Sequence, residues 1–144
     1  MTRRVPQQLP SEEALRLAVE ARAAGRCEYC RAPQWVCGYR FHLDHVVPSS
    51  KFGEDDLENR SLACSPCNLA KSAKTKGTDP DRHRKVRLFN PRSDRWDHHF
   101  RWHADQVTIE GLTATGRATV HELDMNSDMR KQARRLWVKL ELLP

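Results

Sequence analysis

The chain has 144 residues, of which 38% are hydrophobic, and this fits one small domain or one domain with an appendage. Lysine and arginine outnumber aspartate and glutamate by 25 to 19, so the formal net charge is +6. That charge favours polyanionic partners without identifying one. No apolar run of about 18 residues and no signal peptide are visible. We therefore expect a cytoplasmic protein in a reducing compartment, with no membrane contact.

The first predicted element is a helix that begins near Ser11. Residues 1–10 carry two prolines and no apolar periodicity, which predicts a flexible arm. Ser11 can cap a helix whose first turn is acidic and whose end is marked by Gly25. The chain then enters its first cysteine pair.

The next predicted unit runs from residue 27 to about residue 74. The patterns predict a strand over residues 39–44, followed by a polar loop up to Asn59. A short strand over residues 61–63 and a helix that begins at residue 64 complete the unit. The order is hairpin, then helix. A lysine-rich, turn-prone stretch ends this unit by Pro80.

Two Cys-x-x-Cys pairs, Cys27/Cys30 and Cys64/Cys67, have the spacing of zinc knuckles. Together they can supply the four thiolates of a tetrahedral zinc site. A closed site of this kind leaves no position for substrate, so we expect the zinc to be structural and the chemistry to lie elsewhere. Cys37 is left over, and a lone cysteine is more often a small buried apolar residue than a ligand.

An adjacent Asp-His pair lies between the two knuckles. Strand alternation puts Phe41 and Leu43 toward a core and His42 and Asp44 on the opposite face, with His45 at the end of the strand. The carboxylate of Asp44 can hold a hard cation, while a neutral imidazole at His45 can take a proton from water. The pair therefore predicts a catalytic metal site with a general base.

Two asparagines can complete this site. Asn68 follows Cys67 directly, so the zinc pins its backbone at the start of a helix, and its amide oxygen suits Mg²⁺ or Mn²⁺. Asn59 precedes the second strand and can orient the loop or the His45 side chain by hydrogen bonding.

Two further residues have open interpretations. His42 shares a face with Asp44 and can touch metal or phosphate, or instead hydrogen-bond within the hairpin. Lys71, one helical turn beyond Asn68, can bind a flanking phosphate, although an exposed lysine on a helix is more often solvated.

These motifs resemble those of the HNH endonuclease family, which has the ββα-metal (His-Me finger) fold. The resemblance covers residues 26–74 and rests on Cys-x-x-Cys, His-Leu-Asp-His-Val-Val-Pro, Leu-Glu-Asn and Leu-Ala-Cys-Ser-Pro-Cys-Asn-Leu-Ala-Lys. It implies that Asp44 and Asn68 bind the catalytic divalent ion and that His45 activates the hydrolytic water. It also implies that Asn59 supports the loop that carries the histidine.

The remaining chain predicts a small α+β extension. Strand candidates span residues 99–103 and 107–112, and helices span residues 116–123 and 128–140, the last one capped by Ser127. We expect three units: an arm (1–10), a helix with the nuclease domain (11–78) and the extension (79–144). In the extension we assign three tryptophans to the core: Trp96, Trp102 and Trp137. We assign its three histidines to packing or surface positions: His98, His99 and His103.

The expected function is that of a metal-dependent endonuclease acting on DNA, with RNA left open. The alternatives are a zinc-stapled module that binds nucleic acid without cutting it and a nuclease subunit that depends on a partner protein. Basic residues between 71 and 101 can line a duplex path, although charge runs are usually solvated faces. Apolar residues near Leu136 in the last helix are the expected interface for a homodimer.

Overall fold

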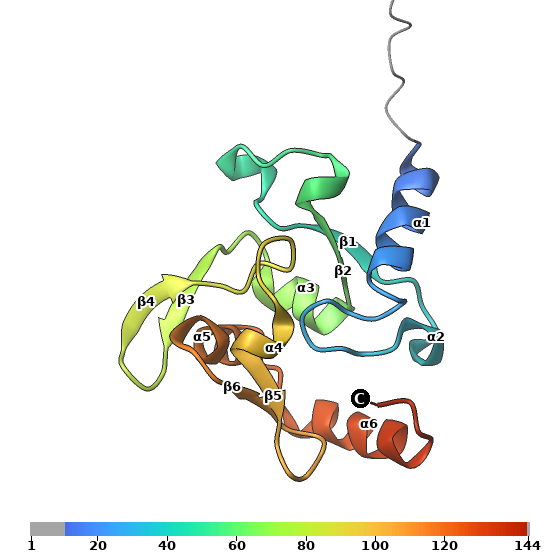
Figure 1. Ribbon diagram of the computed structural model, residues 1–144. Coiled ribbons are helices and arrows are strands. Elements are labelled where there is room, and N and C mark those ends of the chain that lie inside the picture. The colour runs from blue at the N-terminus through green and yellow to red at the C-terminus, as the bar shows by residue number, and fades with distance from the viewer. Residues whose placement is uncertain (1–10, 144) are drawn as a thin grey trace, which may run out of the picture.

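The computed structural model describes residues 11–143, so the arm predicted for residues 1–10 lies outside the described residues. The fold is mixed α+β, as the sequence predicts (Figure 1). The helices are α1 (Glu12–Arg22), α2 (Gln34–Cys37), α3 (Ser65–Lys71), α4 (Trp96–His99), α5 (Ala114–Glu122) and α6 (Asp128–Lys139). The strands are β1 (His42–His45), β2 (Arg60–Ala63), β3 (Lys76–Asp79), β4 (Arg84–Arg87), β5 (Phe100–Trp102) and β6 (Ile109–Gly111).

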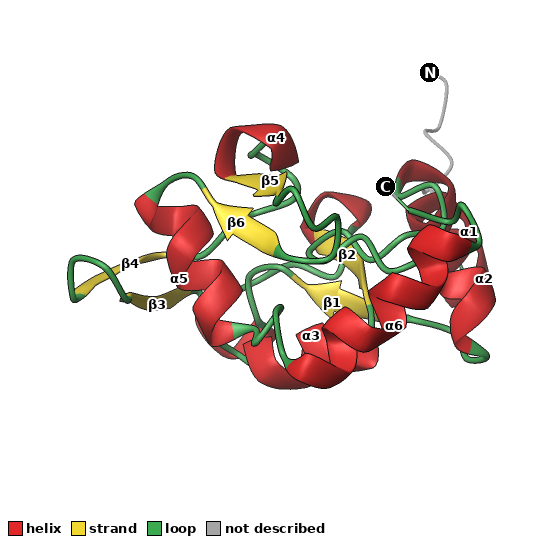
Figure 2. Cartoon of the chain, turned by 90° about the horizontal axis from the view of Figure 1, so that it is seen from below, coloured by secondary structure: helices red, strands yellow, loops and turns green. Residues whose placement is uncertain are grey.

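The strands form three antiparallel pairs, β1–β2, β3–β4 and β5–β6, within the described range. Short 3₁₀ helices, η1 (Ser49–Lys51) and η2 (Leu57–Asn59), lie in the loop between β1 and β2. Figure 2 shows these pairs spread through the molecule, with helices packed around them. None of the helices in residues 11–143 has the length and apolar character needed to cross a bilayer.

The N-terminal helix forms where the sequence predicts it. The Oγ of Ser11 accepts a hydrogen bond from the backbone N–H of Ala14 at 3.1 Å and so caps α1. Leu15 and Val19 are the buried residues of α1. Their burial and the cap fix the helix beside β2 (Figure 1).

The ββα unit is the framework of the candidate site. β1 pairs with β2 so that His42 faces Ala63 and His45 faces Arg60. All four residues of β2 are buried, and Phe41 just before β1 is fully buried. The helix α3 follows β2 after the single residue Cys64, which places both Cys-x-x-Cys pairs and Asn68 close to the hairpin.

The strand β3 lies in the stretch up to Pro80 for which the sequence predicts turns, and that expectation is wrong; for its partner β4 the sequence predicts no element. Gly77 lets the hairpin pack on α5, because a Cβ there would lie 2.3 Å from the Cγ of Glu122. The buried Asp79 accepts two hydrogen bonds from Arg117 of α5, at 3.0 and 2.8 Å. These contacts, above all the hydrogen bonds, lower the pKa of Asp79 to about 2.

The last helix is capped by Ser127 as predicted, and a buried arginine attaches it to the rest of the fold. The one buried residue of α6 is Arg134, which donates hydrogen bonds to the backbone oxygens of Val107 and Met125 at 2.8 and 2.5 Å. Among the apolar side chains expected to form a homodimer interface, Leu136 is 59% and Leu140 is 67% exposed in the single chain, and the interface stays a prediction. An arginine therefore anchors α6 to the β5–β6 connection.

The extension and the ββα unit share one hydrophobic cluster. The boundary expected between residues 78 and 79 falls inside β3. Trp96 donates a hydrogen bond from Nε1 to the backbone oxygen of Tyr29 at 2.9 Å. All three tryptophans of the extension pack against the hydrophobic cluster. The extension is thus built onto the zinc-knuckle region.

Candidate active site

The four predicted zinc ligands lie together in the core. The Sγ atoms of Cys27, Cys30, Cys64 and Cys67 all lie within 4.8 Å of one another, and all four residues are buried. A tetrahedral zinc with sulfur ligands requires sulfurs about 3.8 Å apart, and Cys30 and Cys64 are separated by 3.6 Å. Burial raises the pKa of Cys27 and Cys67, so a bound cation is needed to keep all four sulfurs as thiolates. The cluster fits a structural Zn²⁺.

Arg130 of α6 reaches this cluster from the extension. Its Nη2 lies 2.9 Å from the sulfur of Cys67 and 3.9 Å from that of Cys64. Burial lowers the pKa of Arg130, but the nearby thiolates outweigh this and raise it above its ordinary value. A Zn(Cys)₄ centre carries two negative charges, and Arg130 offsets part of that charge in a buried setting.

Asp44 is held by a buried network rather than being open to solvent on all sides. Its Oδ2 accepts a hydrogen bond from the hydroxyl of Tyr29 at 3.0 Å and lies 3.1 Å from the Nζ of Lys71. Tyr29 belongs to the first zinc knuckle. Burial is the main cause that raises the pKa of its hydroxyl, and the negative charge of Asp44 raises it further. The zinc cluster thus positions Asp44 through one intervening side chain.

Lys71 is 2% exposed, so the expectation of an exposed lysine on this helix is wrong. Besides Asp44, its Nζ contacts the backbone oxygen of His45 at 3.1 Å. The ammonium group is therefore committed to the carboxylate and to the end of β1. A role for Lys71 in binding a flanking phosphate stays a prediction.

The predicted metal ligands and the predicted base line one hollow, which has a volume of about 380 Å³. We call it the active-site hollow, and its lining includes Glu12, His42, Asp44, His45, Arg60 and Asn68. Asn68 comes from α3, and the Asp-His pair comes from β1. Within residues 11–143, neither the Oδ1 of Asp44 nor the side chain of Asn68 forms a hydrogen bond. Carboxylate and amide oxygens are suitable ligands for Mg²⁺ or Mn²⁺, so the donor set fits a hard divalent ion.

The Nε2 atom of His45 has two neighbours. Asp55 places Oδ1 at 2.6 Å from it, and Arg60 places Nη1 at 2.9 Å. A carboxylate only accepts, whereas a guanidinium only donates, so one imidazole proton cannot satisfy both. The shorter, charge-assisted contact with Asp55 favours a proton on Nε2. The hydrogen bond from His45 lowers the pKa of Asp55, which keeps it ionised near neutral pH.

Asn59 supports the loop that follows His45. Its Oδ1 accepts from the N–H of Val47 at 2.9 Å, and its Nδ2 donates to the backbone oxygens of Val47 and Glu54 at 2.9 and 2.7 Å. Gly53 packs against this asparagine and the Val47 oxygen, where a Cβ would lie only 1.7 Å from that oxygen. The Asn59 side chain thus forms, with the backbone of the loop, the kind of hydrogen bonds that a neighbouring strand would form.

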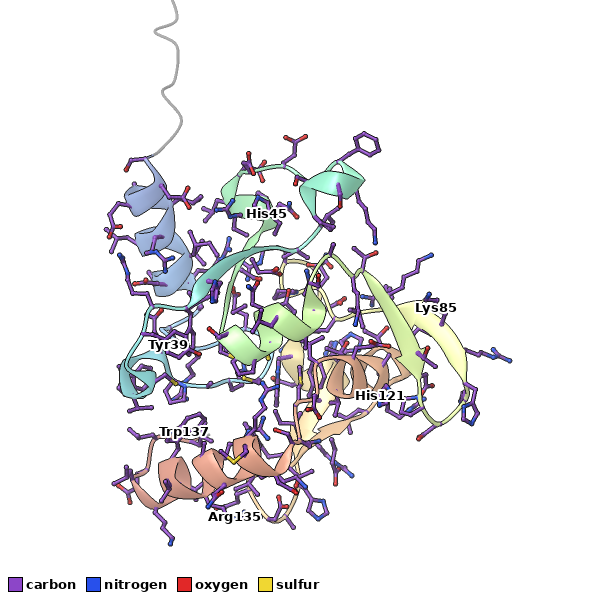
Figure 3. All side chains as sticks on the ribbon, turned by 180° about the vertical axis from the view of Figure 1, so that it is seen from behind. Tyr39, His45, Lys85, His121, Arg135 and Trp137 are labelled. Atoms are coloured by element: carbon purple, nitrogen blue, oxygen red, sulfur yellow. The ribbon has the colours of Figure 1, made fainter. Side chains whose placement is uncertain are left out.

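His42 lies at the start of β1, on the rim of the same hollow. Its Nε2 is 3.0 Å from the Oγ of Ser65, the first residue of α3. This contact reaches α3 and not the hairpin, where the sequence alternative placed the hydrogen bond, and a contact of His42 with metal or phosphate stays a prediction. Figure 3 shows His45 near the top of the view, away from His121 on α5 and Arg135 on α6.

Comparison with known families gives one match. Residues 27–74 match the family model described as HNH endonuclease. Over this segment the chain is similar to HNH endonucleases, and residues 27–74 are here called the HNH domain. The match covers both zinc knuckles, the Asp-His pair, Asn59, Asn68 and Lys71. No curated protein and no solved structure matches the chain.

Three residues that were not predicted from the sequence contact Asp44 or His45: Tyr29, Asp55 and Arg60. Arg60 could have been found, because an antiparallel pairing of residues 42–45 with 60–63 places it opposite His45. Tyr29 and Asp55 carry no such signal, since their contacts depend on how the knuckle and the loop fold back.

The contact between Arg130 and the knuckle sulfurs yields a test of the zinc site. Arg130→Gln should speed the transfer of zinc to a colorimetric chelator and weaken zinc binding by about 10- to 100-fold, because a charge-assisted hydrogen bond to the thiolates is lost. The matched control is Arg135→Gln, an exposed position on the same helix. Equal zinc-transfer rates in the two variants would contradict a role for Arg130 in holding the metal.

Proposed function

We propose that the HNH domain is a divalent-metal-dependent endonuclease that hydrolyses DNA phosphodiester bonds. The observation that carries the proposal is the meeting of Asp44, His45 and Asn68 in one hollow, although they come from β1 and α3. A carboxylate, an imidazole and an amide in one hollow match the needs of metal-assisted phosphodiester hydrolysis. The HNH family match over residues 27–74 supports the same reaction class.

Asp44 and Asn68 would hold the catalytic ion through their side-chain oxygens. Asp44 is suited to this because Tyr29 and Lys71 engage only its Oδ2. When bound, Mg²⁺ or Mn²⁺ would neutralise the charge that develops on the phosphate oxygens and the departing 3′ oxygen. Family analogy predicts products with 5′-phosphate and 3′-hydroxyl ends.

His45 would act as the general base through Nδ1. A proton on Nε2, donated to Asp55, leaves the lone pair on Nδ1, which can then accept a proton from the attacking water. Asn59 keeps the loop after His45 in place through its three backbone hydrogen bonds. Asp55 is therefore assigned as a positioning residue, acting through His45 rather than on the substrate.

One observation favours a second candidate, a zinc-stapled module that binds nucleic acid without cutting it, alone or with a partner protein. The Nζ of Lys71 lies 3.1 Å from Asp44 and supplies the counter-charge that a metal would otherwise provide. In this alternative the site is electrostatically complete without a catalytic ion. Cleavage measurements separate the two candidates.

The first test is cleavage of supercoiled plasmid by the zinc-loaded chain with and without added Mg²⁺ or Mn²⁺. We expect cutting that requires the added ion and falls by about 10²- to 10⁴-fold in His45→Ala, because the general base is lost. His121→Ala is the control, since His121 is an exposed histidine on α5 outside the hollow. Absence of cutting with either ion, in a folded chain with full zinc content, would favour the non-cleaving module.

The second test concerns Asp55. Asp55→Ala should lower kcat by about tenfold and leave KM nearly unchanged, because the imidazole loses the partner that fixes its tautomer. Asp56→Ala removes the same charge from the next residue, which caps nothing through its side chain. Asp55→Glu should recover part of the rate. The positioning role is refuted if Asp55→Ala and Asp56→Ala have the same kcat, measured on a short labelled DNA duplex.

A further inference from the structure

The outer face of the β3–β4 hairpin is strongly basic. In the antiparallel register Lys76 lies opposite Arg87, and Thr78 lies opposite Lys85. Residues directly opposite each other share a face of the sheet, and all four of these are exposed. The other face, with Gly77 and Asp79, packs on α5. One face is therefore used for folding and the other carries three cations and no acid.

Lysines from three segments converge beside this face. They surround a second hollow of about 570 Å³, here called the lysine hollow, which is lined by Lys51, Lys74, Thr75, Lys76 and Lys85. These residues come from η1, from the connection after α3 and from both strands of the hairpin. Figure 3 shows Lys85 on the hairpin where it projects from the body of the protein. The lining contains no carboxylate, so the hollow is a concentrated positive site.

The lysine hollow adjoins the active-site hollow. Ser72 and Ala73 line the active-site hollow, and the next two residues in the chain line the lysine hollow. The two hollows also share η1, because Ser49 lines one and Lys51 lines the other. The Nζ of Lys51 donates to the backbone oxygen of Ala73 at 3.2 Å and joins the two rims. Consecutive Cα atoms are about 3.8 Å apart, so the hollows are within a few nucleotides' reach of each other.

Three of the four lysines that line the hollow form no ion pair within the described residues. Lys74 pairs with Glu122 at 3.2 Å, and Arg87 pairs with Asp94 at 2.5 Å. Lys51, Lys76 and Lys85 form no ion pair within residues 11–143, and Lys76 lies directly opposite the like charge of Arg87. Like charges opposed across a hairpin destabilise it. A polyanion lying on this face would remove that penalty.

We propose that the lysine hollow and the outer face of the β3–β4 hairpin bind the phosphate backbone of double-stranded DNA next to the scissile phosphate. The inference rests on the proposed function, in that DNA is taken as the substrate. The hairpin supplies charge rather than base recognition, because lysine ammonium groups bind phosphates without reading sequence. The extension thus adds binding affinity for the DNA substrate to the HNH domain.

The test is the binding of a fluorescent 20-base-pair DNA duplex, followed by anisotropy without divalent ions, so that no cleavage is needed. We expect K76E/K85E to bind on the order of tenfold more weakly than the natural chain. The slope of log affinity against log salt should also become flatter by about two, since two phosphate contacts are lost. The matched control is R135E/K139E, which changes two exposed charges on α6 by the same amount.

Equal weakening in the two double variants would mean that only net charge matters, and unchanged affinity in K76E/K85E would mean that the hairpin does not touch DNA. Either result overturns the proposal, as does preference for an RNA duplex of the same sequence. K76Q/K85Q guards against misfolding and should weaken binding in the same direction but less. A chain that binds DNA through the hairpin but never cuts would leave this inference standing and refute the proposed nuclease.

Discussion

The rest of the structure depends on four cysteine sulfurs that lie within 4.8 Å of one another in the core. A small chain gains much of its folding free energy from such a metal site, because the ligands meet only when the chain is folded. One knuckle carries Tyr29, which donates to Asp44, and the other immediately precedes Asn68. The cysteine cluster is therefore the shared anchor of both proposed ligands for the catalytic ion.

The same cluster is also where the extension attaches. Arg130 brings α6 to the sulfurs, Trp96 donates to the backbone of the first knuckle, and Arg92 pairs with the buried Glu28 of that knuckle. These contacts explain why the hydrophobic cluster is continuous between the HNH domain and residues 79–143. They also place the β3–β4 hairpin at a fixed position beside the active-site hollow, where its charge can act on a bound polyanion.

The sequence predicts the elements whose signals are local. The Ser11 and Ser127 caps, the cysteine spacing and the Asp-His pair are each visible within a few residues, and the corresponding helices and knuckles are confirmed. It does not predict the β3–β4 hairpin, because the strands are short, polar and held by Asp79 and Arg117 from distant segments. The burial of Lys71 is not predicted for a related reason. A lysine is expected to be exposed unless its carboxylate partner, here Asp44 on a different element, is known. The catalytic assignments of Asp44, His45, Asn59 and Asn68 stay predictions that the geometry accommodates.

We infer that a zinc ion held by the four cysteines organises both the active-site hollow and the extension. Hydrogen–deuterium exchange on the full chain, with zinc and after chelation, tests it most directly. The account predicts that amides of β2, α3 and α6 lose protection together when zinc is removed, because the sulfurs tie all three to one cluster. Retained protection in β2 and α3 without zinc would contradict the claim and place the organising interaction elsewhere.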